Sequence, residues 1–382
     1  SAGECHVDIV EVASSILALP RSKQPSGCFF FVFFSYWATA MKRVMRILLF
    51  LTLSVVLLVS CKQKPVEPKG QTQLLLGTVC TITLYDKSGN TEFDLAFDRI
   101  DEIEHLMSIH LDDSELAEVN RASGVHPVVV SEETFTVIKL ALEIAELSDG
   151  AFDPTIGPLV KLWDISGSNN VPLDEEIKAL LPLVDYKLVV LDEEASSVYL
   201  PAQGMALDLG GIAKGWAADE AGRILSEHKG IVNLGGNVLV MGSKPDSSPW
   251  RIGIQDPDNG RGFYIGIVDL IDQTLVTSGP YERFFEHEGT IYHHILDTET
   301  GYPVVSPLTS VSIITTRSVI ADGLSTAVYA LGPERGLELV NRLDGIEAIL
   351  LTEDRSIYVS EGILDGSVAL NITNPEYTIV NK

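Results

Sequence analysis

The chain has 382 residues, of which 46% are hydrophobic, and it carries a formal net charge of −26 at pH 7. This length is enough for one large domain or two smaller ones with buried cores. Aspartate and glutamate outnumber lysine and arginine 53 to 27, which argues against nucleic acid as a partner because its phosphates would be repelled.

The N-terminal region contains an export signal. Met41-Lys-Arg-Val-Met-Arg46 is basic, and the apolar segment from Ile47 to Val59 is too short to span a bilayer comfortably. The signal ends in Leu58-Val-Ser-Cys61, which resembles a bacterial lipobox, so we expect Cys61 to be the lipidated first residue of the mature protein. A plain cleaved secretion signal is the alternative. The lipobox predicts a lipid-anchored protein on the periplasmic side of the bacterial cell envelope.

These features divide the chain into four parts. We interpret residues 1–40 as an over-extended N-terminus, 41–60 as the signal peptide, 61–73 as a polar tether and 74–382 as the folded domain. In a chain that begins at Cys61, only Cys80 remains as a second thiol. With Cys61 acylated, no internal disulfide can form, so the fold must depend on its core.

The first half of the domain combines strands with amphipathic helices. Alternation predicts a strand over Leu74–Tyr85 and a hairpin of Lys187–Asp192 with Ser197–Pro201. Apolar residues at helical spacing predict helices over Phe93–Ile109, Ser114–Asn120, Ser131–Ser148 and Leu173–Leu181. Ser131 is the expected N-cap of its helix, and either Asp113 or Ser114 is expected to cap the helix over Ser114–Asn120.

The central stretch, residues 205–219, is predicted to run from a strand through Gly210 and Gly211 into a helix over Ala213–His228. Two glycines let the backbone approach a ligand closely, because no Cβ intervenes, and the first helical turn offers N–H groups that suit a phosphate. Lys214 adds a positive charge there. The stretch matches neither a Walker loop nor G-x-G-x-x-G, and an ordinary tight turn is the alternative.

The second half of the domain is richer in strands. They are expected over Ile231–Met241, Trp250–Ile254, Tyr264–Leu270, Leu275–Pro280, Tyr281–His287, Ile291–Leu296, Ser310–Thr315, Glu347–Leu351 and Ile357–Ser360, with helices over Ser318–Leu331 and Glu334–Arg342. Strands and helices mix without strict β-α-β alternation. This order predicts an α+β fold with mixed or antiparallel sheets and packed helices.

Eight short motifs follow one another along this domain. They are Leu76-Gly-Thr78, Met107-Ser108 with Asp113-Ser-Glu-Leu116, Gly150-Ala-Phe-Asp153, Asp208-Leu-Gly-Gly-Ile-Ala-Lys-Gly215, Asn233-Leu-Gly-Gly-Asn237, Thr277-Ser-Gly279, His294-Ile-Leu-Asp-Thr-Glu-Thr-Gly301 and Ala321-Asp-Gly-Leu-Ser-Thr326. The series resembles the ApbE family of FAD:protein FMN transferases, whose architecture is related to the T-fold. The resemblance covers roughly Leu74 to Leu351.

The resemblance implies that the chain cleaves FAD with the help of a divalent cation, usually Mg²⁺. FMN would be attached by a phosphoester to a threonine of an acceptor protein, with release of AMP. The residues implied to bind FAD are Leu76, His110, Ala151, Phe152, Asp153, Gly210, Lys214, Trp216 and Leu296. Among them, Leu76 would contact the adenine side, and Gly210 and Trp216 would flank the pyrophosphate.

The implied metal ligands are Asp322, Ser325, Thr326 and the carbonyl of Ala213. Hard oxygen donors suit Mg²⁺, which usually takes few ligands from protein. Asp322 and Thr326 are four residues apart, so they share one face of a helix. Taken alone, Asp322 also fits a helix N-cap and Thr326 a surface hydroxyl.

The implied base is His294, whose neutral imidazole would take the proton of the acceptor threonine as its oxygen attacks phosphorus. A lone histidine in a strand is more often structural. His293 should point to the opposite face of the strand. His110 stands where transferases of the family commonly carry tyrosine, which leaves the balance between transfer and hydrolysis open.

Three functions therefore remain at this point. The first is an Mg²⁺-dependent FMN transferase that acts on an exported or membrane redox protein. The second is a periplasmic FAD pyrophosphatase that yields FMN and AMP, and the third is a non-enzymatic flavin-binding lipoprotein. Asp322, Thr326 and His294 argue against the third function, because a carrier would need neither a metal nor a base.

Overall fold

The computed structural model describes residue 37 and residues 40–48, 66–167, 169–259 and 262–380. The chain divides into two compact units, Ser1–Pro65 and Val66–Lys382. In the first unit, residues 40–48 are helical, whereas Cys61 and residues 49–60 of the expected signal lie outside the described residues. None of the helices in the described ranges combines the length and the apolar character needed to cross a membrane.

The second unit contains helices and strands in both halves. Its helices are α2 (Thr91–Met107), α3 (Glu115–Arg121), α4 (Glu132–Leu147), α5 (Gly157–Trp163), α6 (Asp174–Leu180), α7 (Ala213–Ile224), α8 (Ser318–Val340) and α9 (Glu361–Leu364), with 3-10 turns η1 (Leu181–Leu183) and η2 (Tyr186–Leu188). Its strands are β1 (Lys69–Leu75), β2 (Thr78–Leu84), β3 (Val128–Val129), β4 (Val190–Asp192), β5 (Ser197–Tyr199), β6 (Gly230–Leu234), β7 (Asn237–Met241), β8 (Trp250–Gln255), β9 (Tyr264–Leu270), β10 (Thr274–Ser278), β11 (Phe284–His287), β12 (Thr290–His293), β13 (Leu308–Thr315), β14 (Glu347–Thr352), β15 (Ser356–Val359), β16 (Leu370–Ile372) and β17 (Thr378–Ile379).

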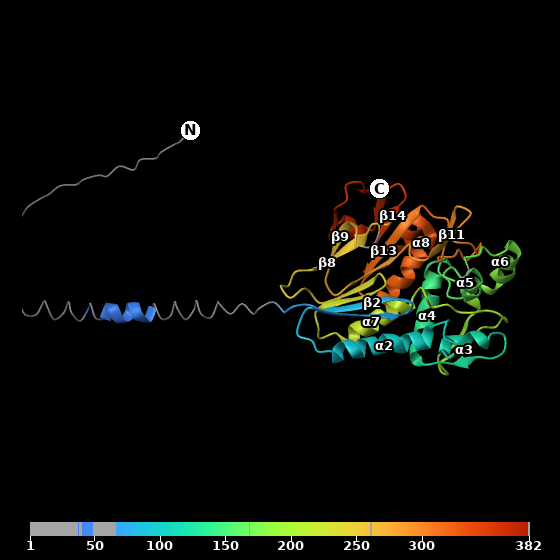
Figure 1. The fold of residues 1–382 in the computed structure, drawn as a ribbon, viewed down its shortest axis with the longest axis horizontal. Helices are drawn as coiled ribbons and strands as arrows, with labels where there is room; N and C mark the ends of the chain where they lie inside the picture. The colour runs from blue at the N-terminus through green and yellow to red at the C-terminus, as the bar shows by residue number, and fades with distance from the viewer. Residues whose placement is uncertain (1–36, 38–39, 49–65, 168, 260–261, 381–382) are drawn as a thin grey trace, which may run out of the picture. The chain divides into compact units, whose positions relative to one another are not determined.

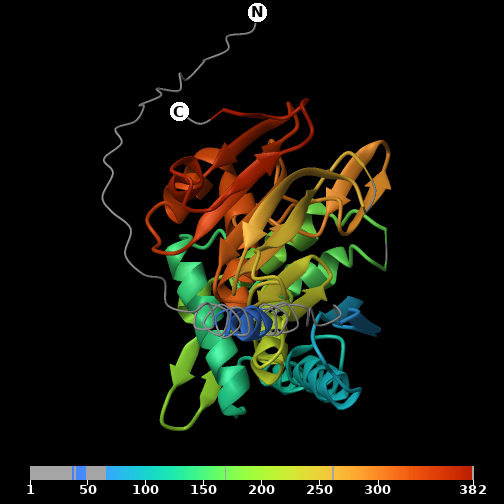
Figure 2. The same cartoon turned by 90° about the vertical axis from the view of Figure 1, so that its left-hand side faces the viewer.

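The largest sheet has the strand order β1-β2-β6-β7-β10-β13-β14-β15-β17. Its last pair, β15 with β17, is parallel, and the other described pairs are antiparallel. Smaller sheets are β16-β9-β8, β3-β5-β4 and the hairpin β11-β12. Figure 2 shows that hairpin in orange, projecting from the body of the unit at the upper right.

The middle of the large sheet is buried on both faces, because its strands carry apolar residues at successive positions. On β14, Ala348 and Leu350 join the core beneath the helices, whereas Ile349 and Leu351 join a second core. Helices α7 and α8 pack on the first face, and residues of β8 and β9 cover the second. In Figure 1, α2 and α7 lie below β2, and β8 and β9 lie at the upper left. The expected α+β class is therefore confirmed.

Serine caps start two of the helices where the sequence predicts them. The Ser131 hydroxyl accepts the Thr134 N–H at 3.2 Å, and the Ser114 hydroxyl accepts the Ala117 N–H at 2.9 Å. Each bond satisfies a first-turn N–H group that has no partner within its own helix.

The edge strand β1 differs from the sequence-based expectation. Lys69–Leu75 begins inside the segment assigned to a tether, yet it pairs with β2 along its whole length. An edge strand can be held by backbone hydrogen bonds to one neighbour and does not need a buried apolar face. The sequence of β1 is mostly polar, so it lacks the apolar alternation from which strands were predicted.

Residues 205–209 were expected to form a strand, and this expectation is wrong. They make only an isolated bridge, Ile156 with Ala206. The Asn120 side chain instead accepts the Leu207 N–H at 2.7 Å and donates to the Leu207 carbonyl at 2.9 Å. The Asn120 amide thus pairs with the backbone groups of Leu207 that a neighbouring strand would otherwise bind. Leu207 and Leu209 are buried although this segment belongs to no sheet.

Two predicted helix boundaries also change. Helix α7 ends at Ile224 rather than His228. The two helices expected after Arg317 are the two parts of α8, which is interrupted at Gly332 with φ 79° and ψ 179°. Pro333 then opens the second part, as proline can at the start of a helix.

Helices α7 and α8 meet at Gly215, where a Cβ atom would lie 2.3 Å from the Ser318 carbonyl oxygen. Asp219 accepts the N–H groups of Ser318 at 2.7 Å and Val319 at 3.0 Å. In return, Asp322 accepts the Gly215 N–H at 2.9 Å. Each helix therefore satisfies N–H groups in the first turn of the other. Asp219 caps α8, so the N-cap alternative for Asp322 is wrong.

We predict that Gly215→Ala destabilises the protein by about 1–3 kcal/mol, because the added methyl group meets rigid backbone. Gly222→Ala on the same helix is the matched control. Its Cβ atom would meet only the end of the Leu239 side chain, at 2.4 Å, and alanine gains about 1 kcal/mol of helix propensity over glycine. Urea unfolding measures both variants, and equal losses would contradict the proposed close contact of the two helices.

Candidate functional site

Two adjoining cavities lie beside the start of α7. The inner cavity has a volume of about 180 Å³ and the outer one about 500 Å³. Five residues line both of them: Val160, Asp208, Gly210, Lys214 and Arg283. The glycine turn that stood out in the sequence therefore lies at the boundary of the two cavities.

The structure brings most of the implied site residues to these walls. The inner cavity is lined by Ala151, Phe152, Asp153, Gly210, Lys214, His294, Leu296 and Thr326. The outer cavity is lined by Leu76, His110, Gly210, Ala213 and Lys214. Segments from both halves of the chain thus meet around one turn.

The turn itself is tight and close to an aromatic ring. The Gly210 N–H donates to Asp208 Oδ1 at 2.7 Å, and burial raises the pKa of the Asp208 carboxyl. A Cβ atom on Gly211 would lie 3.1 Å from Phe152 Cε2, so a side chain there would crowd the inner wall. The absence of a Cβ atom on Gly211 thus lets the backbone pack against Phe152, and close approach to a ligand stays a prediction.

Two cationic side chains, Lys214 and Arg283, lie at the shared wall together with Asp208, although the chain as a whole is acidic. Lys214 Nζ lies 3.3 Å from the Gly210 carbonyl and 3.2 Å from Asp322 Oδ1. The exposed Arg283 is the second cation that lines both cavities. Two cations beside a backbone turn are the arrangement expected for an anionic ligand such as a phosphate.

The implied metal ligands divide into two groups. Asp322 is 2% exposed and lies next to Lys214, and Thr326 lines the inner cavity one helical turn later. The hydroxyl of Ser325, by contrast, donates to the Asp322 carbonyl at 2.8 Å and bonds the Ser278 hydroxyl at 2.7 Å. Ser325 therefore braces α8 against β10 and does not line either cavity.

The donors of Asp322, Thr326 and the Ala213 carbonyl are all hard oxygens, which is the chemistry that Mg²⁺ prefers. The described residues contain no group of three or more His, Cys, Asp or Glu side chains placed to hold a metal ion. A cation here would accordingly rely on one carboxylate together with neutral oxygens and the oxygens of its ligand.

His294 follows β12 directly and lines the inner cavity. Its Nδ1 lies 3.2 Å from the Arg283 carbonyl, which can only accept, so Nδ1 carries the proton and Nε2 keeps a lone pair. Burial lowers the pKa of His294 to about 4, and the nearby charges of Arg283 and Lys214 add to this effect. The ring is therefore neutral at pH 7 and has the form required of a general base.

The neighbouring His293 has a structural role. It is 7% exposed, its Nε2 bonds the Val304 carbonyl at 3.0 Å, and its Nδ1 accepts the Ile295 N–H at 3.3 Å. Its ring also packs edge-on against Tyr329. His293 is therefore held by partners within the protein, whereas His294 lines the inner cavity.

Asp153 lines the inner cavity, but its carboxylate is already used by the protein. Oδ1 accepts the N–H and hydroxyl of Thr155 at 2.7 and 2.6 Å, and Oδ2 accepts the Tyr186 N–H at 2.9 Å. Burial raises the pKa of this carboxyl. Asp153 thus shapes the wall by anchoring two loops.

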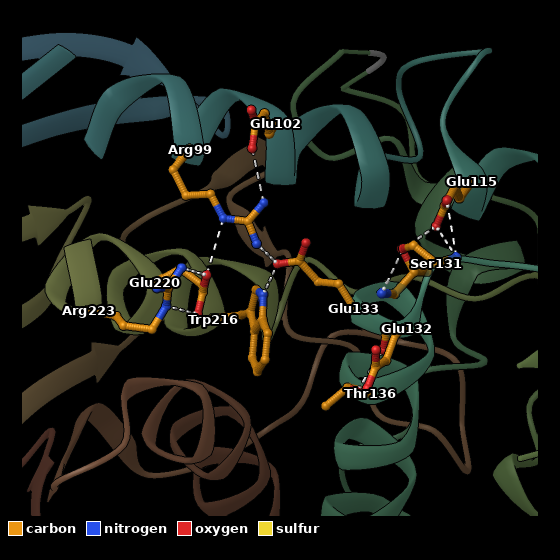
Figure 3. A network of polar contacts seen from close by, with 11 residues as sticks. Arg99, Glu102, Glu115, Ser131, Glu132, Glu133, Thr136, Trp216, Glu220 and Arg223 are labelled. Carbon is orange, nitrogen blue, oxygen red and sulfur yellow. Dashed lines mark hydrogen bonds and ion pairs between the residues drawn. The ribbon is translucent and has the colours of Figure 1, made fainter. Parts of the chain in front are cut away.

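Trp216 does not lie at the turn, contrary to the implied assignment. It is two residues after Lys214, which places it about 200° around α7. Its indole N–H donates to Glu133, which also pairs with Arg99, as Figure 3 shows. Arg99 further contacts Glu220 at 3.2 Å, so this network ties α2, α4 and α7 together away from the two cavities.

Asp208, Asn237 and Arg283 are among the wall residues that were not selected from the sequence. Asp208 is the first residue of its motif and Asn237 is the last residue of its own, so their place in those motifs was a usable signal. Arg283 lies in no motif, and only the approach of the β11–β12 hairpin brings it to the cavities.

An α+β fold with a glycine turn and two cations beside a cavity defines a protein suited to a phosphate-bearing ligand. The ApbE family model matches residues 76–350. A FAD:protein FMN transferase of Treponema pallidum (strain Nichols) is 36% identical over 321 residues, covering 78% of this chain and 89% of the relative. Another, from Klebsiella pneumoniae (strain 342), is 38% identical over 291 residues, covering 75% and 90%.

Solved structures agree with these sequence relationships. The ApbE protein of Thermotoga maritima matches with a TM-score of 0.72 at 35% identity, covering 78% of this chain and 98% of that one. The flavin transferase ApbE of Vibrio cholerae matches with a TM-score of 0.71 at 28% identity, covering 79% and 99%. The chain belongs to the ApbE family, as its eight motifs predict.

Proposed function

We propose that this protein is an FAD:protein FMN transferase that moves FMN from FAD to a threonine of an exported or membrane redox protein and releases AMP. The observation that carries the proposal is the lining of the inner cavity. Lys214, Arg283 and the neutral His294 all line this cavity together with the glycine turn. The names of the relatives from Treponema pallidum and Klebsiella pneumoniae support it.

His294 acts as the base in this proposal. Its Nε2 takes the proton of the threonine hydroxyl, while the Arg283 carbonyl holds Nδ1–H and fixes the tautomer. A pKa of about 4 makes a weak proton acceptor at pH 7, but Lys214 and Arg283 contribute to that low value. A bound pyrophosphate would offset their charges and raise the pKa of His294 towards the working pH.

Mg²⁺ would be held by Asp322, Thr326 and the carbonyl of Ala213. When bound, it would neutralise charge on the pyrophosphate and orient it. Lys214 and the Gly215 N–H position the Asp322 carboxylate for this task, and Lys214 balances its negative charge.

FAD hydrolysis to FMN and AMP is the second candidate. It is favoured by the exposed His110, which lines the outer cavity where the family's transferases commonly carry tyrosine. A smaller ring covers less of a bound flavin nucleotide and admits water more readily than tyrosine would.

We predict that His294→Ala lowers FMN transfer by roughly 10²–10⁴-fold, because a threonine hydroxyl is a poor nucleophile without a base. Release of free FMN should fall less, since water is activated more easily. Mass spectrometry of a threonine peptide incubated with FAD and Mg²⁺ measures both products. The control is His287→Ala on β11 of the same hairpin, and intact transfer by His294→Ala would rule out this base.

We predict that Asp322→Asn nearly abolishes AMP release and weakens FAD binding only modestly, because neutral oxygens alone bind Mg²⁺ poorly. Asp219→Asn is the matched control, since Asp219 makes the reciprocal contact between α7 and α8 without lining a cavity. If both variants lose activity equally, Asp322 is structural. Turnover of the wild-type protein in excess chelator would also refute a metal requirement.

We further propose that Cys61 is acylated and anchors the protein on the periplasmic side of the cell envelope. The sequence Leu58-Val-Ser-Cys61, which resembles a lipobox, supports this proposal. Expression in a bacterial host with labelled fatty acid should label the wild-type protein and place it in the membrane fraction. Cys61→Ala should lose both the label and the membrane association. A variant that keeps both would exclude the anchor.

A further inference from the structure

Asn237, the first residue of β7, is a buried amide without a partner. It is 1% exposed, and no described group of the protein hydrogen-bonds its side-chain oxygen or nitrogen. Buried polar groups in folded proteins are nearly always paired, so such an exception calls for an explanation.

The hairpin geometry fixes the direction of this side chain. Gly235 and Gly236 have φ values of 62° and 100° and form a two-residue turn that pairs Leu234 with Asn237. On the other side, Asn237 pairs with Val276 of β10. Side chains directly opposed on neighbouring strands lie on the same face, so Asn237 shares the helix-covered face with two buried apolar residues.

The turn does not need this amide. The Gly236 N–H donates to the side chain of Asn233 at 3.1 Å, so a different asparagine supports the hairpin. An apolar residue at position 237 would continue the row formed by Leu234 and Val276. The polar side chain of Asn237 therefore interrupts a hydrophobic face and makes no hydrogen bond that would stabilise the fold.

Asn237 lines the inner cavity together with Phe152, Val276 and His294. The neighbouring hydroxyls on β10 are already engaged, that of Thr277 with Ser312 at 2.8 Å and that of Ser278 with Ser325 at 2.7 Å. Asn237 thus carries an unused acceptor and donor pair among the residues that line this cavity.

We propose that the Asn237 amide recognises an adjacent donor–acceptor edge on a heteroaromatic ring of the nucleotide held in the inner cavity. A carboxamide has an acceptor oxygen beside a donor nitrogen, and asparagine pairs in this way with adenine. FAD carries two such edges, the amino group and ring nitrogen of adenine and the imide N–H and carbonyl of the flavin. The identity of the nucleotide rests on the proposed function.

The test is Asn237→Leu, which replaces the amide by an apolar group of similar size. In the absence of ligand, thermal stability should stay equal or rise, because an unpaired buried amide is removed. Affinity for one fragment of FAD should fall by roughly 10- to 100-fold, the loss expected for two neutral hydrogen bonds. Calorimetry with AMP and with FMN identifies the ring, since only the fragment in contact with Asn237 should bind more weakly.

Thr309→Val is the matched control, because the Thr309 hydroxyl is also buried and unpaired in the described structure but lines neither cavity. It should tolerate the change and bind both fragments as the wild type does. Asn237→Ala replaces the leucine variant if that variant does not fold, and the same loss of affinity is expected. The proposal would be overturned if the tested Asn237 variant bound both AMP and FMN as tightly as the wild type. It would also be overturned if the variant lost stability without losing affinity for either fragment.

The two proposals can fail separately. A wild-type protein that binds AMP or FMN in an Asn237-dependent way but neither transfers FMN nor hydrolyses FAD would refute the proposed function and leave the recognition intact. An Asn237→Leu protein with unchanged binding and intact transfer would refute only the role of Asn237.

Discussion

The close contact of α7 and α8 at Gly215 is the constraint on which the candidate site depends. Without a Cβ atom, the backbone of α7 approaches the Ser318 carbonyl, and Asp219 and Asp322 each accept N–H groups from the opposite helix. Because Lys214 precedes Gly215, the same contact places its ammonium group beside Asp322. A single packing requirement thus joins the glycine turn to the face of α8 that carries Thr326.

Charge is distributed so that the fold and the cavities use different cations. Arg99 is surrounded by Glu102, Glu133 and Glu220, and hydrogen bonds to these carboxylates raise its pKa despite burial. The Arg99 guanidinium therefore holds α2, α4 and α7 together (Figure 3). Lys214 and Arg283 instead line the cavities, where an acidic chain would otherwise repel an anion.

The two histidines after β12 illustrate how one residue step separates structure from chemistry. His293 has both ring nitrogens occupied inside the core, whereas His294 has Nδ1 held by the Arg283 carbonyl and lines the inner cavity. Successive side chains of an extended segment point to opposite sides, so a shift of one residue would exchange these environments. The pairing register of β11 with β12 therefore decides which of the two histidines lines the inner cavity.

The sequence by itself determined the elements whose signals are local. Helical spacing placed α3 and α4, the Ser131 cap gave the start of α4, and the ordered motifs identified the family. These features succeed because a helix buries one face and satisfies its own backbone, which leaves a periodic pattern in the sequence. The same local rule explains why the polar edge strand β1 was missed.

Only the tertiary structure decided where side chains with several possible partners would go. Asn120 replaces a strand for Leu207 from 87 residues away, Trp216 turns to Glu133, and the contact between Gly215 and Asp322 spans 107 residues. Whether an amide such as that of Asn237 finds a partner also depends on which strands flank it. Such contacts follow from the packing of distant elements, and periodicity along the chain carries no record of them.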